Sequence, residues 1–167
     1  MSSSYQQGQF FLLPLGRSEY AVGLIARVPR RGGVLLGYFF GPRRTKAPDG
    51  ASLNDLTAAQ AVLACRFKDT ALMRAEWPLL GMLARFDCSD WPVPAFHRFE
   101  GSTTYVPGNA TSDWRVEYSD DNLIVPVAER PAEGGDLKLA EDTVYDTGLL
   151  AKEVGQRVRS MVPTIGD

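Results

Sequence analysis

A chain of 167 residues that is 44% hydrophobic and 23% charged is long enough to bury a core without disulfide staples. Its two cysteines form no CxxC pair, so we expect both to be reduced thiols. The longest apolar run is too short to span a membrane, and the first residues lack the basic and apolar regions of a signal peptide. These features predict a cytoplasmic protein with no membrane partner.

The charge is distributed unevenly along the chain, although the net charge is only −2. Residues 1–50 carry seven basic and two acidic side chains, whereas residues 111–147 carry three basic and ten acidic ones. One basic face and one acidic face could steer a charged partner. Charge of this kind also keeps proteins soluble, so the pattern alone does not choose between the two roles.

The first part of the chain predicts a meander of three antiparallel strands at residues 9–15, 20–28 and 34–40, joined by short turns. Two of these strands have an interior glycine, Gly23 and Gly37, and such glycines often mark a bulge or a bend. We therefore expect a strongly bent antiparallel sheet whose curvature approaches that of a barrel.

The middle of the chain is expected to hold a short helix. Ser52 followed by Asp55 resembles an N-cap with an acidic residue three positions later, which predicts a helix over residues 53–61. Residues 62–67 could extend that helix, but the surrounding pattern favours a strand. Further strands are expected at residues 77–83 and 96–105.

The last third predicts a β-hairpin and a terminal helix. Residues 114–118 alternate apolar and polar side chains, and a polar turn at 119–122 joins them to a second strand at 123–127. The apolar spacing after Thr147 predicts a helix that ends near Met161.

These elements predict an α+β fold: a strongly bent antiparallel sheet, a short middle helix and a C-terminal helix. We expect a single domain at residues 8–163. A flexible N-terminus at residues 1–7 and a tail at residues 164–167 would flank it.

The loop at residues 86–96 crowds aromatic residues, two prolines and two carboxylates into a short stretch. Asp87 and Asp90 could act as acid and base, but Asp and Ser before a Trp-Pro pair are also common loop formers. A small hydrolase using Asp87 or Asp90 would have to recruit His97, the only histidine, and no nucleophile motif surrounds it. His97 and the two cysteines also lack the spacing of zinc ligands. We therefore predict no catalytic residue, metal or cofactor, and keep the hydrolase as the alternative.

A set of basic residues could hold phosphates: Arg27, Arg30, Arg31, Arg43, Arg44 and Lys46. Nucleic-acid binding favours a basic face studded with aromatic residues, and residues 38–40 are aromatic. The chain as a whole is acidic, however, and those aromatic residues alternate as core residues do. A nucleic-acid or small-molecule binding module is therefore a second alternative rather than the expectation.

Acidic residues gather on the predicted hairpin: Asp113, Glu117, Asp120, Asp121 and Glu129. A solvated edge that resists aggregation would explain them. A surface that imitates a polyanion for a basic partner would explain them equally well. The sequence leaves both interpretations open.

Five motifs follow one another in the chain: GQFFLLPL (8–15), YAVG (20–23), LGYFF (36–40), WPLLG (77–81) and FDCSDWPVPAF (86–96). In this order and spacing they resemble the immunity protein 26 family of bacterial polymorphic toxin systems, over about residues 8–125 with a weaker echo at the terminal helix. Gly8-Gln9 stands where the family often has Gly-Asp. The resemblance implies a non-catalytic, antitoxin-like protein that binds a toxin domain encoded nearby and blocks it.

Toxin contacts are then expected among aromatic residues with acidic neighbours. The candidate contact residues are Asp90, Trp91, Asp113, Glu117, Asp120 and Asp121. If the acidic hairpin makes the contact, charge reversal at Asp120 and Asp121 should weaken toxin binding.

Overall fold

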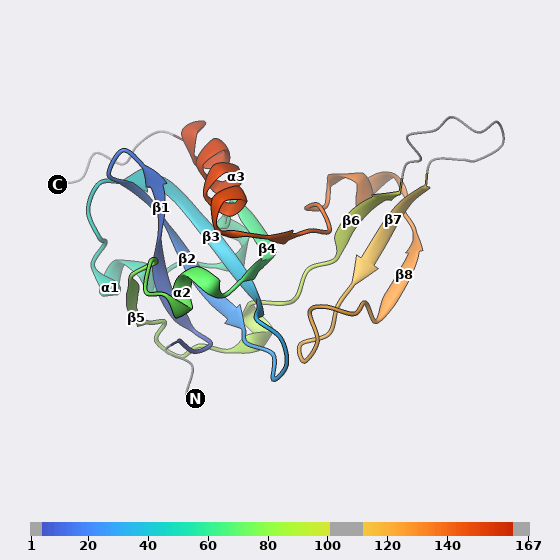
Figure 1. Ribbon diagram of the computed structural model, residues 1–167, viewed down its shortest axis with the longest axis horizontal. Helices are drawn as coiled ribbons and strands as arrows, with labels where there is room; N and C mark the ends of the chain where they lie inside the picture. Colours follow the sequence, from blue (N-terminus) through green and yellow to red (C-terminus); the bar gives the residue numbers. More distant parts are fainter. Residues whose placement is uncertain (1–4, 101–111, 162–167) are drawn as a thin grey trace.

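The computed structural model describes residues 5–100 and 112–161, and its fold is α+β, as predicted (Figure 1). A six-stranded mixed sheet has the order β5-β1-β2-β3-β4-β9, and a three-stranded sheet has the order β6-β7-β8. The strands are β1 (Gln9–Gly16), β2 (Glu19–Arg27), β3 (Val34–Arg44), β4 (Leu63–Lys68), β5 (Leu79–Met82), β6 (Phe96–Glu100), β7 (Ser112–Glu117), β8 (Ala128–Pro131) and β9 (Val144–Tyr145). The helices are α1 (Gly50–Leu53), α2 (Thr70–Met73) and α3 (Thr147–Arg159). Three 3-10 turns are η1 (Ala58–Gln60), η2 (Cys88–Asp90) and η3 (Gly134–Lys138).

The predicted three-stranded meander is confirmed as β1, β2 and β3, which pair antiparallel. The large sheet continues to β5 at one edge and to β9 at the other, so the described strands form an open sheet and no closed barrel. Both faces of the meander are buried: Phe11 and Phe39 point into one core, whereas Phe10 and Tyr38 point into the other. The large sheet therefore needs a cover on each side.

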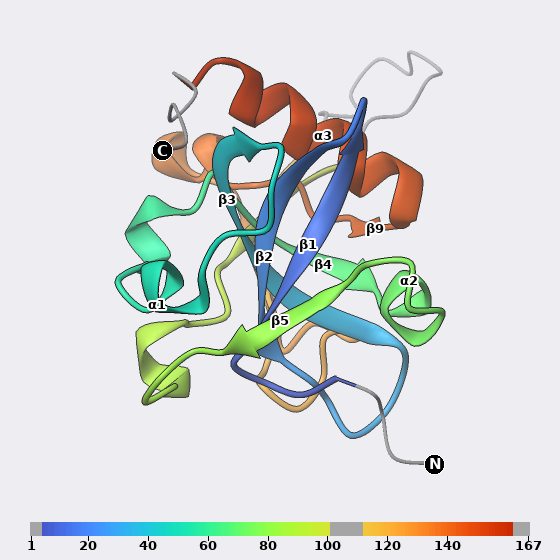
Figure 2. The same cartoon turned by 90° about the vertical axis from the view of Figure 1, so that its left-hand side faces the viewer.

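The helix α3 covers one face of the large sheet (Figures 1 and 2). It begins at Thr147, as predicted, where the Asp146 carboxylate accepts a hydrogen bond from the Leu149 N–H. It ends at Arg159, two residues before the expected end at Met161. Its buried Leu150 and Val154 join the core formed by the aromatic side chains of that face. The amphipathic spacing in the sequence therefore gave the correct helix.

The other face is covered by the loop at residues 86–96 and by the small sheet. Trp91 and Phe96 from the loop region, and Val116 and Tyr118 from the small sheet, lie in one buried cluster with β1–β3 residues. The alternation predicted over residues 114–118 thus places Val116 and Tyr118 in the core, with Trp114 partly buried beside them. This second layer brings the small sheet against the large one.

Gly23 and Gly37 lie where aromatic rings pack closely against the strands. The β2 register is regular at Gly23 and shifts instead on either side of it, between Tyr20 and Val22 and between Ile25 and Arg27. A Cβ at Gly23 would lie 2.3 Å from the Phe11 Cζ atom, and one at Gly37 would lie 2.7 Å from the Phe67 Cε1 atom. No bulge lies at Gly23, whereas an irregularity between β2 and β3 begins next to the pair formed by Ile25 and Gly37. At both glycines the missing side chain makes room for an aromatic ring.

The middle helix is shorter and earlier than expected. Asp49, not Ser52, caps α1 through a bond from the Ala51 N–H, and the helix ends at Leu53. Asn54 accepts a hydrogen bond from the Ala84 N–H at 3.0 Å, a tertiary contact that the local sequence pattern does not contain. The helix predicted over residues 53–61 is therefore wrong in its bounds. The strand predicted at 62–67 is confirmed as β4.

The second strand of the predicted hairpin is also displaced. Residues 123–127 are irregular, and β7 pairs instead with β8, with Glu117 opposite Ala128. The Asn122 side chain accepts bonds from the Ile124 and Val125 N–H groups at 2.9 and 3.0 Å, so these amides do not pair with a neighbouring strand. The end of the strand predicted at 96–105 and the tail at 164–167 lie outside the described residues.

The packing at Gly23 predicts a stability difference between two strand glycines. Gly23→Ala would place its methyl group inside the Phe11 ring, so we expect a loss of about 1–3 kcal/mol in the free energy of unfolding. Gly81→Ala in β5 is the matched control, since no atom outside its chain neighbours lies within 4 Å of a Cβ there. Urea denaturation of both variants measures the difference. Equal stability of the two variants would contradict the packing argument.

Candidate functional site

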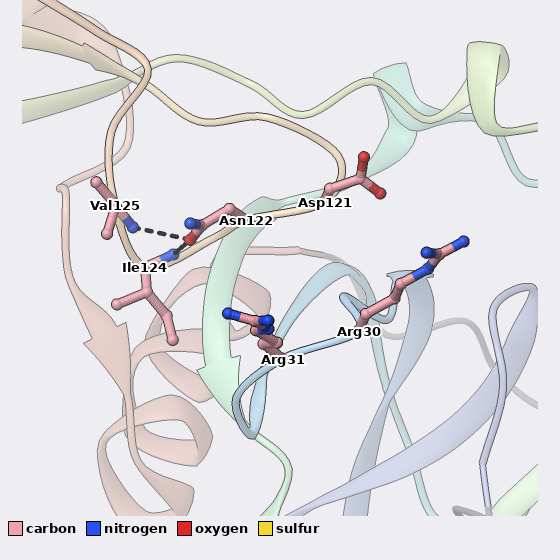
Figure 3. Close-up of a pocket in the computed structure, with 6 residues that line it drawn as sticks. All are labelled: Arg30, Arg31, Asp121, Asn122, Ile124 and Val125. Atoms are coloured by element: carbon pink, nitrogen blue, oxygen red, sulfur yellow. Dashed lines mark hydrogen bonds between the residues drawn. The ribbon is translucent and has the colours of Figure 1, made fainter.

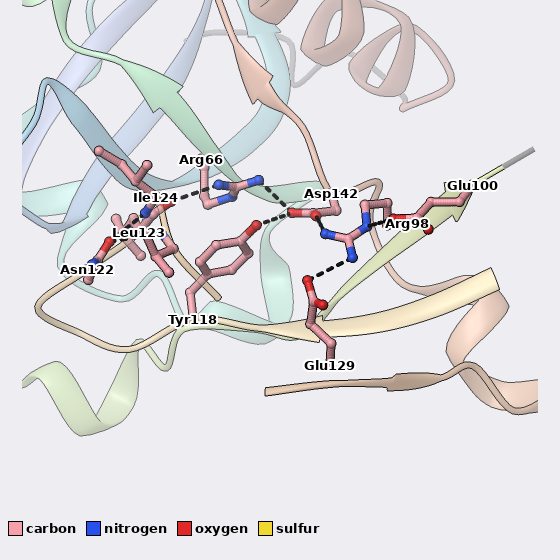
Figure 4. A network of polar contacts seen from close by, with 10 residues as sticks. Arg66, Arg98, Glu100, Tyr118, Asn122, Leu123, Ile124, Glu129 and Asp142 are labelled. Atoms are coloured by element: carbon pink, nitrogen blue, oxygen red, sulfur yellow. Dashed lines mark hydrogen bonds and ion pairs between the residues drawn. The ribbon is translucent and has the colours of Figure 1, made fainter. Parts of the chain in front are cut away.

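The two sheets are joined by a buried ion pair between Arg66 of β4 and Asp142 (Figure 4). Arg66 Nη2 donates a hydrogen bond to Asp142 Oδ1, with 2.5 Å between the two atoms, and both side chains are about 95% buried or more. From the small-sheet side, the Tyr118 hydroxyl donates to the same carboxylate at 2.9 Å. The Arg66 guanidinium also stacks 4.0 Å from the Tyr118 ring centroid. One carboxylate thus receives donors from both sheets.

Tyr118 remains neutral over the ordinary pH range. Burial, reinforced by the hydrogen bond to Asp142, raises the pKa of Tyr118 to about 12. The Tyr118 hydroxyl therefore keeps the proton that it donates to Asp142.

A second arginine, Arg98 of β6, extends this network toward solvent. It lies 2.7 Å from Glu129 of β8 and 3.7 Å from Asp142. The bond to Glu129 and the neighbouring carboxylates raise the pKa of Arg98. The network therefore crosses the small sheet from its core-facing side to its edge strand.

Arg27, at the end of β2, ties together three segments that are distant in sequence. It is almost fully buried, with 4% of its surface exposed. Its Nε donates to Asp120 at 2.6 Å, its Nη1 to the Ala26 carbonyl at 2.8 Å and its Nη2 to the Cys88 carbonyl at 3.0 Å. The turn after β7 and the loop at residues 86–96 are thereby fixed against the large sheet.

A groove opens beside the contacts of Arg27, between the β2–β3 turn and the segment after β7 (Figure 3). Its volume is about 530 Å³, and its lining residues are Arg30, Arg31, Asp121, Asn122, Ile124 and Val125. Arg30 and Asp121 lie toward one end, Ile124 and Val125 toward the other, and Arg31 between them. The groove is therefore charged at one end and aliphatic at the other.

The aliphatic end belongs to residues 122–127, which we call the aliphatic loop. Ile124, Val125 and Val127 are 52%, 59% and 62% exposed, respectively, although all three are branched apolar residues. The loop is fixed where it begins and ends: Arg66 Nη1 donates to the Leu123 carbonyl at 2.7 Å, and the Val127 N–H donates to the Glu117 carbonyl at 2.8 Å. Apolar side chains held exposed by such bonds are typical of an interaction surface.

The turn opposite is shaped to meet this loop. Gly32 has a φ of +83°, and a Cβ on it would lie 2.6 Å from Ile124 Cδ1. The absence of a side chain at Gly32 lets Ile124 lie against the turn, so the two walls of the groove are in contact below its opening.

The structure separates the six contact residues predicted from the sequence into three places. Asp121 lines the groove, and Asp120 precedes it in the chain and pairs with Arg27. Asp113 and Glu117 lie along β7, where Asp113 is 2.6 Å from His97 and Glu117 is 2.8 Å from Arg115. Asp90 lies in η2, next to Trp91.

Trp91 belongs to the core. Only 3% of its surface is exposed, and its ring packs edge-on against Tyr38 and Phe40 at centroid distances of 5.2 and 6.0 Å. The expectation that Trp91 is an exposed aromatic contact is therefore wrong. Its neighbour Asp90 is exposed and borders a separate hollow of about 500 Å³.

Most acidic side chains of the predicted hairpin lie beside an arginine or histidine side chain. Of its five acidic residues, four have a basic partner: Asp113, Glu117, Asp120 and Glu129. Only Asp121 has no ion pair with a described residue. Arg27 from the basic region meets Asp120 from the acidic region, so the two regions do not form the separate faces that the sequence suggested.

The geometry gives the hydrolase alternative no support at the expected residues. Asp87 accepts bonds from the Ser89 N–H and hydroxyl, both at 2.8 Å, which lower the pKa of Asp87. His97 is bonded to Asp113, and within residues 5–100 and 112–161 no hydrogen bond or ion pair joins it to Asp87 or Asp90. The loop-forming role of Asp87 and Ser89 is confirmed.

Neither a metal centre nor a membrane span is found in the part of the chain that the structure describes. No group of three or more His, Cys, Asp or Glu side chains there is arranged to hold an ion. No helix there combines the length and the apolar character needed to cross a bilayer.

Sequence reasoning missed the aliphatic loop because residues 123–127 were interpreted as a strand. Pro126 was the available signal against that interpretation, since proline cannot donate to a sheet ladder. Asn122 was the second signal, because Asn often bonds to the backbone of the following residues. Arg30 and Arg31 were noted only as phosphate ligands.

The sequence profile of the immunity protein 26 family matches residues 6–104, which is more than half of the chain. The chain belongs to the immunity protein 26 family. The family implies an immunity function and a non-catalytic role. No curated protein and no solved structure gives a significant match. The match includes the groove wall formed by Arg30 and Arg31 and ends before the wall formed by the aliphatic loop.

The buried ion pair predicts a large effect on stability. Asp142→Asn would leave the Arg66 charge buried without its counterion, so we expect the free energy of unfolding to fall by about 3–5 kcal/mol. The control is Glu153→Gln, which breaks a partly exposed pair with Arg157 on α3 and should cost about 0.5 kcal/mol or less. Guanidinium denaturation measures both variants. A loss for Asp142→Asn as small as that of the control would show that the pair does not hold the sheets.

Proposed function

We propose that this protein neutralises a cognate bacterial toxin domain, encoded nearby, by binding it stoichiometrically in the cytoplasm and covering a surface that the toxin needs. No catalysis by the immunity protein is involved. Membership of the immunity protein 26 family supports the class of function. The groove and the aliphatic loop support the place on this protein where we propose that the toxin binds.

The observation that carries the proposal is the exposure of Ile124, Val125 and Val127 on a loop that the structure fixes. A loop already held in one conformation loses little conformational entropy when it binds. Exposed apolar side chains bordered by charged ones provide the arrangement of a typical interface, with an apolar centre and a polar rim. We therefore place the centre of the toxin interface on the aliphatic loop.

The acidic candidates take different parts in this proposal. Asp121 lines the groove and is available to contact the toxin. Asp120 fixes the turn through Arg27, so its contribution is to position the loop. Asp90, Asp113 and Glu117 remain proposed contacts at the periphery. An interface of about 1,600 Å² in total would reach across several of these places.

The proposal is tested by co-expressing this chain with the product of the neighbouring gene in bacteria. We expect the neighbouring product alone to arrest growth, and we expect co-expression to restore growth and to yield a 1:1 complex on purification. Arrested growth without a complex would contradict neutralisation by binding. Restored growth without a complex would instead indicate a catalytic mode of protection.

A substitution in the aliphatic loop tests the location. Val125→Asn replaces an exposed apolar side chain with a neutral polar one, so we expect affinity for an inactivated toxin to fall by about fivefold or more, or about 1 kcal/mol. Stability should change by no more than about 0.5 kcal/mol, since the side chain is exposed. Isothermal titration calorimetry measures the affinity.

The matched control is Leu149→Asn on α3, which changes an aliphatic residue that is 56% exposed on a different element. We expect this variant to bind the toxin as the wild type does. Equal weakening by both substitutions, or by neither, would show that the aliphatic loop is not the centre of the interface.

A further inference from the structure

We infer that the groove receives an acidic segment of the toxin, with carboxylates directed at Arg30 and Arg31 and an apolar side chain packed on Ile124 and Val125. This inference rests on the proposed function and specifies the chemistry of the partner. It reverses the sign expected from the sequence, in which acidic residues of this chain would attract a basic toxin surface.

The first argument is the balance of charge at the groove. Asp120 is compensated by Arg27 at 2.6 Å, so it adds little attraction for a basic partner. Arg30 and Arg31 are both exposed, and neither forms an ion pair with a described residue. Asp121 is then the remaining acidic residue among those that line the groove. Two arginines against one aspartate leave the groove basic.

The second argument is geometric. Arg30 and Arg31 are neighbours on a turn that lines the groove; Arg31 lies between its two ends, and Arg30 extends toward the end where Asp121 lies (Figure 3). Arginine donates two parallel hydrogen bonds to a carboxylate, which gives direction as well as attraction. Arginine is also among the residues that most often dominate protein interfaces. A carboxylate entering here would lie beside Ile124, where apolar contact adds to the ion pair.

The third argument separates a polypeptide from a nucleic acid. Single-stranded nucleic acids bind grooves that combine basic residues with aromatic stacking platforms. The apolar residues that line this groove are Ile124 and Val125, and none of the lining residues is aromatic. Asp121 would also repel the phosphates of a continuous polyanion. A short acidic and apolar segment of a protein satisfies both ends of the groove.

The test measures the affinity of the variants for the inactivated toxin at about 150 mM salt. For R30E combined with R31E, we expect affinity to fall by about tenfold or more, because two favourable contacts become repulsive. K46E combined with K152E makes the same change in net charge at two exposed positions, after the far end of β3 and on α3. We expect this control to bind within about twofold of the wild type.

Two further variants sharpen the result. Asp121→Asn should bind more tightly than the wild type, since it removes from the groove a negative charge that repels the acidic segment. In a set of toxin variants that each have one Asp or Glu changed to Lys, we expect one variant to bind R30E/R31E more tightly than the unchanged toxin does. Circular dichroism checks folding, and Arg30→Gln combined with Arg31→Gln replaces R30E/R31E if that variant is misfolded.

Several outcomes would overturn the inference. Equal weakening by R30E/R31E and K46E/K152E would show only long-range charge attraction. Strong weakening by Asp121→Asn would show that Asp121 itself contacts a basic toxin surface. Binding of a labelled 20-nucleotide RNA that R30E/R31E abolishes, with toxin binding unchanged, would assign the groove to phosphates. Loss of affinity in Val125→Asn but not in R30E/R31E would leave the proposed function standing and refute this inference alone. The absence of any wild-type complex would refute both.

Discussion

The arrangement of the two sheets depends on one buried carboxylate, that of Asp142. It receives Arg66 from the large sheet and Tyr118 from the strand region of the small sheet. Removing two charges from water is unfavourable unless their remaining hydrogen-bonding groups are also satisfied. Here the Leu123 carbonyl accepts a hydrogen bond from Arg66 Nη1, although Arg66 Nε is buried without a partner among the described residues. The charge pair thereby also fixes the chain just before Ile124. The contact that holds the sheets together therefore also holds the aliphatic loop.

Arg27 makes a similar contact with Asp120, three residues before Leu123 in the same segment. Its guanidinium leaves the large sheet to bind Asp120 and the Cys88 carbonyl, so it connects the turn after β7 with the Trp-Pro loop. Two buried arginines thus hold residues 120 and 123, and residues 121–125 form one wall of the groove. The exposed apolar residues that follow are held in place by these contacts with buried arginines, and a segment already held in one conformation loses little entropy on binding.

The sequence predicted the parts of the fold that depend on local patterns. The meander, α3 and the loop role of Asp87 follow from periodicity and turn chemistry, and the family was recognisable from ordered motifs. The helix predicted at 53–61 rested on a capping pattern and the strand predicted at 123–127 on a hairpin pattern. Neither pattern reveals the hydrogen bonds that the Asn54 and Asn122 side chains accept in these segments.

The candidate site was predicted only in fragments for a related reason. Asp120 and Asp121 were selected for their charge, but that charge has meaning only relative to Arg27 and Arg30, which lie about ninety residues away in the sequence. No local pattern reveals which acidic residues are already compensated. Burial of Trp91 likewise follows from its packing on Tyr38, a tertiary contact that neither residue indicates alone.

Hydrogen exchange of the purified complex with an inactivated toxin tests the central claim most directly. If the toxin covers the groove, the amides of residues 30–33, 122–125 and 127 should exchange more slowly in the complex than in the free protein, while those on the outer side of α3 should be unchanged. Protection confined to α3 or to the β5 edge, with the two groove walls unaffected, would contradict the claim that this surface neutralises the toxin.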